Sequence, residues 1–130
     1  MNSFAYLALV EYRRRKDSVD RAVSAGRFGR ADGEALLARW LGIARACGVP
    51  VQDLEPLLAE WTGLPHDLGD HLPPRTDCLA ELARARDAAA AAAAASPNDK
   101  ARHTRSMTLS TLAHYLGAPA PARAQLKEAA

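Results

Sequence analysis

The sequence has few aromatic residues and few cysteines, and each shortage narrows the class of protein. Phe, Trp and Tyr make up 5% of the 130 residues, so a core must be built mainly from Ala, Leu and Val. The only cysteines, Cys47 and Cys78, lie far apart and in no pair motif. This spacing argues against a disulfide framework and favours buried free thiols in a reducing compartment, so we expect a cytoplasmic protein.

Long apolar runs are missing as well. Nowhere do about 18 apolar residues follow one another, so the sequence predicts no membrane-spanning helix. The apolar segment Phe4 to Val10 is followed by a positive run and is not preceded by one, which is not the order of a secretory signal peptide. We therefore expect no membrane partner.

β-Branched residues are sparse and helix formers dominate, so the sequence predicts an all-α fold. The length suits a single domain over residues 1–130, a compact bundle of four to five helices. Glycine and proline positions place the helices at about 3–25, 31–47, 52–62, 76–95 and 97–116. Pro56 should delay the regular part of the third helix. A Pro- and Gly-rich loop is expected at 63–75, and a short helix or a frayed tail at 118–130.

Apolar spacing predicts the buried side of each helix. In the first helix the residues expected to face the core are Phe4, Tyr6, Leu7 and Val10. The second helix has the clearest apolar stripe, which comprises Leu36, Leu37, Trp40, Leu41, Ile43, Ala44 and Cys47. In the last helix the residues expected to be buried are Met107, Leu109, Leu112, Ala113 and Leu116.

The C-terminal half should form an antiparallel helical hairpin. Ser96, Pro97 and Asp99 predict a helix start with a serine N-cap, a proline at the first helical position and a carboxylate at the third. So short a connection between two long helices favours a hairpin. The alanine run Ala88 to Ala95 gives the first of these helices a smooth face. That face could pack within the chain or against a second copy, which leaves a homo-oligomer open.

The segment from 43 to 58, IARACGVPVQDLEPLL, has the spacing of a helix-turn-helix. Ala44, Gly48 and Leu54 occupy the positions of the small residue, the turn glycine and a seating apolar residue. However, no Lys or Arg occurs from Val49 through Gly63, so the second helix offers a polyanion no cation. Two core helices that meet at a glycine turn are the favoured interpretation over a DNA-reading element.

Charge is unevenly distributed although the net charge is only +2. Residues 1–50 and 83–130 are basic, whereas residues 51–82 are acidic. Two groups of cations are candidate binding residues: Arg13, Arg14, Arg15 and Lys16 in the first helix, and Lys100, Arg102 and Arg105 at the start of the last. The first group could contact a phosphate or an acidic partner, or could simply be a solvated helix face.

One segment carries a resemblance to known proteins. An arginine-rich helix, a Val-x-x-Gly-Arg turn (Val23, Gly26, Arg27) and an amphipathic helix follow one another from Glu11 to Ala44. This arrangement resembles a segment of small, uncharacterised helical proteins that phages and prophages encode. Those proteins bring no known activity, so the resemblance implies at most an origin on a mobile element.

A metal site is the remaining candidate for chemistry. His66, Asp70 and His71 are of the types that bind zinc, and they lie close together within the expected loop. A solvated, hydrogen-bonded loop is the favoured alternative, because polar residues among glycines and prolines are typical of surface turns. Enzymatic use of the loop would need His103 or His114 within ligand distance.

These features favour a non-enzymatic helical protein that docks on a protein or nucleoprotein partner, as an inhibitor, an assembly factor or a small subunit of a complex. No cofactor is expected. The alternative is a DNA- or RNA-binding regulator that uses the two groups of cations. The third hypothesis is a metal-dependent hydrolase that uses the loop from His66 to His71.

Overall fold

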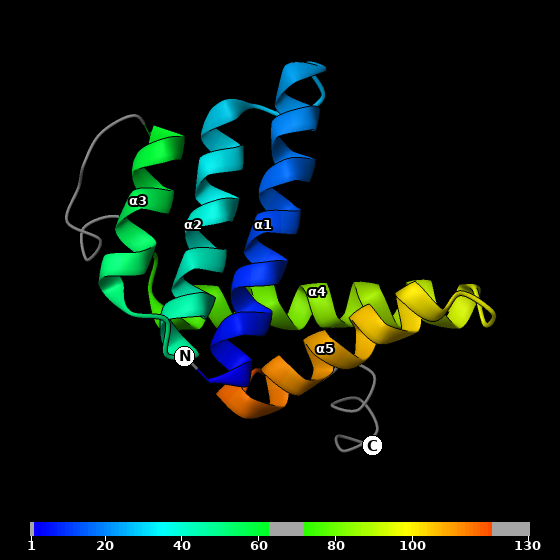
Figure 1. Ribbon diagram of the computed structural model, residues 1–130. Coiled ribbons are helices and arrows are strands. Elements are labelled where there is room, and N and C mark those ends of the chain that lie inside the picture. Colours follow the sequence, from blue (N-terminus) through cyan, green and yellow to red (C-terminus); the bar gives the residue numbers. More distant parts are fainter. Residues whose placement is uncertain (1, 63–71, 121–130) are drawn as a thin grey trace. The chain divides into compact units, whose positions relative to one another are not determined.

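A computed structural model describes residues 2–62 and 72–120, and its regular structure is entirely helical (Figure 1). The helices are α1 (Ser3–Ser24), α2 (Arg30–Ala46), α3 (Val51–Thr62), α4 (Arg75–Ala95) and α5 (Lys100–Leu116). Within these ranges there is no strand, so the predicted all-α class is confirmed. None of the described helices is both long and apolar enough to span a bilayer. Most of the predicted loop and tail, 63–71 and 121–130, lies outside the described residues.

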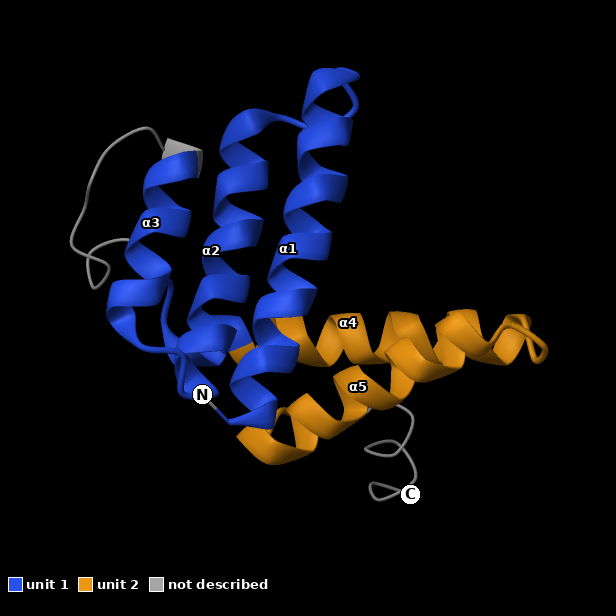
Figure 2. Ribbon diagram, viewed as in Figure 1, with its two compact units in different colours: residues 1–78 blue, residues 79–130 orange. Residues whose placement is uncertain are grey.

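The chain divides into two compact units, Met1–Cys78 and Leu79–Ala130 (Figure 2). The first unit contains α1, α2, α3 and the start of α4, and the second contains the rest of α4 together with α5. Whether the units make up the single predicted domain stays a prediction.

In the first unit, α2 lies between α1 and α3 and packs against both (Figure 1). The predicted stripe of α2 is confirmed except at Leu36, which is half-buried, since Leu37, Trp40, Leu41 and Ile43 are at most 1% exposed. Asn2 connects the ends of two helices: its Oδ1 accepts a hydrogen bond from the Ala5 N–H at 2.8 Å, and its Nδ2 donates to the Cys47 carbonyl at 3.2 Å. This N-cap fixes the start of α1 beside the end of α2.

The predicted buried face of α1 is wrong. Tyr6 is 63% exposed and Val10 is 44% exposed, whereas Ala5, Ala8 and Tyr12 are fully buried. Small alanines let the backbone of a neighbouring helix approach closely, so the helix turns its alanine side inward and leaves Tyr6 and Val10 facing outward. Phe4 and Leu7 are half-buried at the edges of this face.

The ends of three helices follow the predicted glycines. Gly26 and Gly117 have φ of 72° and Gly48 has φ of 105°, values that residues with a Cβ rarely adopt. The predicted effect of Pro56 is wrong, because α3 is helical from Val51 and includes the proline. The hydrogen bond that Pro56 cannot donate would have gone to the first turn of the helix, where its loss is tolerated.

Gly42 permits a close approach between α2 and the start of α4. A Cβ placed on Gly42 would overlap the Cys78 Sγ, and Cys78 is 3% exposed. The Cys78 thiol also donates a hydrogen bond to the Pro73 carbonyl at 3.7 Å, a sulfur contact. Both cysteines are free and buried, which confirms their prediction as core residues.

In the second unit, α4 and α5 pack as the predicted antiparallel hairpin (Figure 1). The predicted start of α5 is wrong by three residues: Asp99 is the N-cap and accepts a hydrogen bond from the Arg102 N–H, while residues 96–99 form the connecting turn. Met107 was expected in the core but is 71% exposed. Its neighbours Leu109, Leu112, Ala113 and Leu116 are buried as predicted.

Buried alanines recur at every fourth position of α4, from Ala85 into the alanine run. Ala85, Ala89 and Ala93 are at most 9% exposed, whereas the other alanines from 88 to 95 are half-buried or exposed. This spacing places the three buried alanines on one side of the helix.

Candidate functional site

The cationic run of α1 is divided between internal contacts and solvent. Arg15 and Lys16 bind carboxylates one turn away, with 3.1 Å from Arg15 Nε to Glu11 Oε1 and 2.9 Å from Lys16 Nζ to Asp20 Oδ2. Arg13 and Arg14 are exposed, and neither forms an ion pair with any residue that the structure describes. Only half of the run is therefore available to a partner through its charge.

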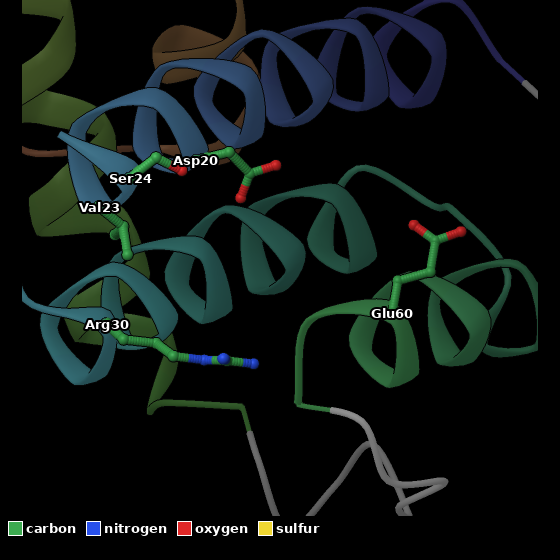
Figure 3. Close-up of a pocket in the computed structure, with 5 residues that line it drawn as sticks. All are labelled: Asp20, Val23, Ser24, Arg30 and Glu60. Carbon is green, nitrogen blue, oxygen red and sulfur yellow. The ribbon is translucent and has the colours of Figure 1, made fainter.

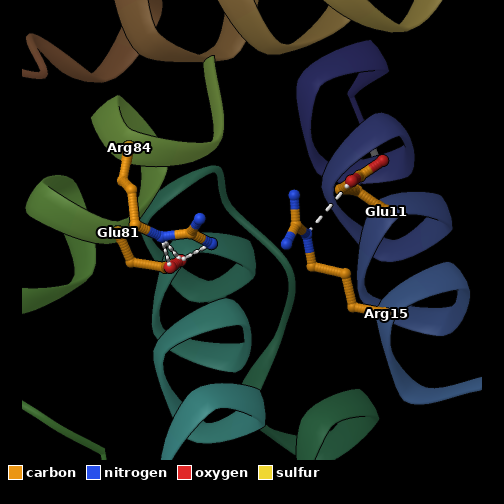
Figure 4. Close-up of polar contacts among 4 residues, drawn as sticks. All are labelled: Glu11, Arg15, Glu81 and Arg84. Atoms are coloured by element: carbon orange, nitrogen blue, oxygen red, sulfur yellow. Dashed lines mark hydrogen bonds and ion pairs between the residues drawn. The ribbon is translucent and has the colours of Figure 1, made fainter. Parts of the chain in front are cut away.

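Arg15 is held against the protein core by two contacts. Its guanidinium lies over the Trp40 ring, 4.1 Å from the ring centroid, and binds Glu11 (Figure 4). Glu11 is 4% exposed, and the ion pair with Arg15 helps to offset the loss of water around its carboxylate. The cation–π contact with Trp40 thus joins α1 to the core of α2, while the buried ion pair with Glu11 lies within α1.

The outer face of α1 combines apolar and cationic side chains. We use this name for Tyr6, Val10, Arg13 and Arg14, all of which are exposed. Val10 follows Tyr6 by four residues, and Arg13 and Arg14 follow Val10 by three and four, which brings all of them to one side of the helix over about two turns. Tyrosine and arginine are residue types that are enriched in protein–protein interfaces, and Val10 adds apolar surface beside them. The sequence pattern predicts the arginines as binding residues but predicts a buried position for Tyr6 and Val10.

The ends of α1 and α3 and the start of α2 enclose a shallow cleft of about 280 Å³ (Figure 3). Its lining comprises Asp20, Val23, Ser24, Arg30 and Glu60. Two of these charges are already paired, Asp20 with Lys16 and Arg30 with Glu34, where Arg30 Nε lies 3.6 Å from Glu34 Oε1. The cleft therefore carries little net charge and has no strong preference for an ion.

Burial and the negative charges near this cleft both raise the pKa of the Tyr12 phenol. Burial, together with the charges of Glu60 and Asp20, raises the pKa of Tyr12 from 10.0 to about 12. The hydroxyl has no hydrogen-bond partner among the residues that the structure describes. Tyr12 is therefore neutral at physiological pH.

The second group of candidate cations lies at the start of α5. Lys100 and Arg102 are exposed, whereas Arg105 is half-buried. Arg102 is held in the turn, because its Nη1 donates to the Ser96 Oγ at 2.7 Å and its Nε lies 3.3 Å from the Asp99 carboxylate. Arg102 therefore closes the hairpin turn and is less available to a ligand than its exposure suggests.

The buried charges of α4 also pair locally. Glu81 is 5% exposed and binds Arg84, with 2.6 Å from Nε to Oε1 (Figure 4). This hydrogen bond raises the pKa of the Arg84 guanidinium. Burial raises the pKa of the Cys47 thiol to about 11 and that of the Cys78 thiol above its usual value. Neither thiol is activated as a nucleophile, because the reactive thiolate is disfavoured.

The corner between α2 and α3 has the predicted helix–turn–helix order. Ala44 and Leu54 are buried on either side of Gly48. The exposed side of α3 presents Gln52, Asp53 and Glu55 and no cation. These exposed carboxylates would repel a phosphate backbone.

The predicted metal ligands His66, Asp70 and His71 lie outside the described residues. Among residues 2–62 and 72–120 there is no group of three or more His, Cys, Asp or Glu side chains placed to hold a metal ion. His103 binds within the hairpin turn, with its Nε2 3.0 Å from the Pro97 carbonyl.

No protein-family model, curated protein or solved structure matches the chain. The resemblance of residues 11–44 to phage-encoded proteins therefore stays a prediction.

Proposed function

We propose that the protein is a non-enzymatic binding module, and that the outer face of α1 docks on a protein or on the protein part of a nucleoprotein complex. One observation carries the proposal: Tyr6 and Val10 are exposed on the same side of the helix as Arg13 and Arg14. The roles that fit are those of an inhibitor, an assembly factor or a small subunit. The resemblance to phage proteins adds the proposal that a mobile element encodes it.

The chemistry of this face favours a protein partner. Tyr6 and Val10 gain hydrophobic energy only if a partner covers them, and a tyrosine can do so while its hydroxyl keeps a hydrogen bond. Arg13 and Arg14 flank the apolar residues and would select a partner with carboxylates at the rim of its binding surface. A nucleic acid would use the arginines but would leave Val10 without a matching contact.

A crosslinking experiment tests the proposal. A photoreactive amino acid replaces Val10, and in a control protein it replaces Ser110, an exposed residue of α5. After irradiation in an extract of the source cells, we expect discrete crosslinked species from position 10 and not from position 110. Adding Arg13→Gln and Arg14→Gln to the position 10 protein should lower their yield several-fold. Equal and diffuse crosslinking from both positions would contradict a docking role for α1.

A DNA- or RNA-binding regulator remains the second proposal. The observation that favours it is the exposure of Arg13 and Arg14 without ion pairs among the described residues. In this case binding would weaken steeply with salt, because each neutralised phosphate releases counterions.

A further inference from the structure

The exposed side of α3 is acidic and has no internal cation. Asp53 and Glu55 are exposed, and neither forms an ion pair within the residues that the structure describes. No Lys or Arg occurs between Val51 and Thr62. Val51 itself is 37% exposed and lies one turn before Glu55. This helix thus presents carboxylates beside an apolar residue, whereas α1 presents arginines beside apolar residues.

The charges on the two helices have matching positions. With 3.6 residues per turn, Arg13 and Arg14 fall on opposite flanks of the line from Tyr6 to Val10. By the same geometry, Asp53 and Glu55 fall on opposite flanks of the line formed by Gln52, Pro56 and Ala59. Two helices that pack along these lines would bring an arginine and a carboxylate together on each side, as flanking charges do in coiled coils.

These two surfaces do not pack on each other within one copy. In the first unit α2 lies between α1 and α3 and packs against both (Figure 1). Arg13 and Arg14 form no ion pair with Asp53 or Glu55. The complementary charges must therefore be satisfied by water or by another molecule.

We propose that the protein associates with itself head to tail, with the outer face of α1 in one copy docked on the exposed side of α3 in a second copy. This inference rests on the proposed function, because it names a second copy as an occupant of the same α1 face. The contact joins two different surfaces, so each bound copy still presents one free surface of each kind. Association can then continue beyond a dimer.

Sedimentation velocity at low ionic strength tests the association. The wild-type protein should show a weight-average sedimentation coefficient that rises with concentration. The rise should disappear near 1 M NaCl, where the screening length falls to about 3 Å. Arg13→Gln/Arg14→Gln should abolish association, and so should Asp53→Asn/Glu55→Gln.

The matched control, Arg27→Gln/Arg45→Gln, removes two exposed positive charges elsewhere in the first unit and should associate like the wild type. The decisive experiment is an equimolar mixture of Arg13→Gln/Arg14→Gln, the α1 variant, and Asp53→Asn/Glu55→Gln, the α3 variant. The α1 variant keeps its α3 surface and the α3 variant keeps its α1 surface, so the mixture should form a one-to-one complex and nothing larger. Neutral substitutions are used because reversed charges would create a new attractive pair.

The outcomes separate this inference from the proposed function. A wild-type protein that stays monomeric at low salt overturns the inference, and so does a mixture that stays monomeric while the wild type associates. Either result leaves the proposed function standing if crosslinking from position 10 still captures a different protein. If crosslinking from position 10 also fails, both proposals are overturned.

Discussion

At the scale of single residues, the availability of each cation in α1 depends on its neighbours one turn away. Arg15 follows Glu11 by four residues and Lys16 precedes Asp20 by four, so both find a carboxylate on their own helix. The four charges look equivalent in the sequence, but only Arg13 and Arg14 lack such a contact among the described residues. A variant meant to test binding should therefore leave Arg15 unchanged.

Replacing Arg15 with alanine should destabilise the protein, whereas replacing Arg13 should not. Arg15→Ala removes the stacking on Trp40 and the ion pair with the buried Glu11 carboxylate, so we expect a loss of about 3 kcal/mol in the free energy of unfolding. Arg13→Ala should change it by less than about 0.5 kcal/mol. Urea unfolding followed by tryptophan fluorescence measures both values.

A second variant measures how much of this loss comes from the buried charge of Glu11. Glu11→Gln/Arg15→Ala should recover part of the loss, because the buried negative charge that Arg15 pairs with is then removed as well. Equal stability of Arg15→Ala and Arg13→Ala would contradict the structural role of Arg15.

The buried phenol of Tyr12 should make stability fall at alkaline pH. Its pKa is raised from 10.0 to about 12 in the folded protein, so between these values the unfolded state loses its proton while the folded state keeps it. The free energy of unfolding is unaffected below pH 10 and should drop by up to about 3 kcal/mol by pH 12. Tyr12→Phe should lack this part of the decline.

The same variant should cost little at neutral pH. The Tyr12 hydroxyl donates no hydrogen bond within the described residues, so its removal leaves no buried partner unsatisfied there. Denaturant unfolding of the wild type and Tyr12→Phe at pH 7 and across pH 9–12 gives both comparisons. Parallel pH profiles for the two proteins would show that the phenol is not the group responsible.

At the scale of helices, the close contact of α2 with the start of α4 depends on the missing side chain of Gly42. Alanine in a helix interior normally stabilises it by about 1 kcal/mol relative to glycine. Here the new methyl group would overlap the Cys78 sulfur, so we expect Gly42→Ala to destabilise the protein by about 1–3 kcal/mol.

The effect of Gly42→Ala on stability should change sign once the Cys78 sulfur is removed. In a Cys78→Ala background the nearest atom to the new methyl group is the residue 78 Cβ at 3.6 Å, an ordinary contact. Gly42→Ala should then be neutral or stabilising, and thermal unfolding of the four proteins in this double-mutant cycle measures the coupling. A similar cost of Gly42→Ala in both backgrounds would exclude the proposed clash.

The helices themselves were predictable because their ends carry local signals. Gly26, Gly48 and Gly117 end helices in a backbone conformation that other residues avoid, and these glycines are visible in the sequence. The start of α5 was not predictable, because Ser96 and Asp99 are both good N-caps. The choice of Asp99 depends on the turn that joins α4 to α5.

The exposed face of α1 was harder to predict, for a related reason. Large apolar residues dominate any count of periodicity, so Tyr6 and Val10 outweighed Ala5 and Ala8 in the sequence pattern. The buried side is decided by how closely α2 can approach, which a sequence pattern does not measure. The division of the cationic run was not predictable either: Arg13 precedes Asp17 by four residues just as Lys16 precedes Asp20, yet only Lys16 forms its ion pair among the described residues.

At the scale of the whole molecule, positive and negative charges nearly balance, and the exposed candidate cations are spread over different helices. The net charge is +2, and the exposed cations among the candidate residues are Arg13, Arg14, Lys100 and Arg102. Proteins whose affinity for DNA depends strongly on salt commonly make about six to ten phosphate contacts. The four exposed candidate cations are fewer than this number.

Binding to nucleic acid should therefore be weak and only moderately sensitive to salt. Fluorescence anisotropy with labelled double-stranded DNA and single-stranded RNA should give a slope of log affinity against log salt no steeper than about −4. Arg13→Gln/Arg14→Gln should reduce any binding, and the control Arg27→Gln/Arg45→Gln should reduce it less. A slope of about −6 or steeper that depends on Arg13 and Arg14 would favour the regulator over the docking protein.

The contact between Gly42 and Cys78 also provides a built-in probe of how fast the two segments separate. A thiol packed against another helix meets an alkylating reagent only while the two segments are apart, so the labelling rate of Cys78 reports how often they separate. At high reagent concentration the rate becomes that of the opening step itself. Cys47, buried near the end of α2, provides a second and separately resolved reading by mass spectrometry. The rate of local opening of the first unit could thus be measured with the native cysteines, without introducing a probe residue into the chain.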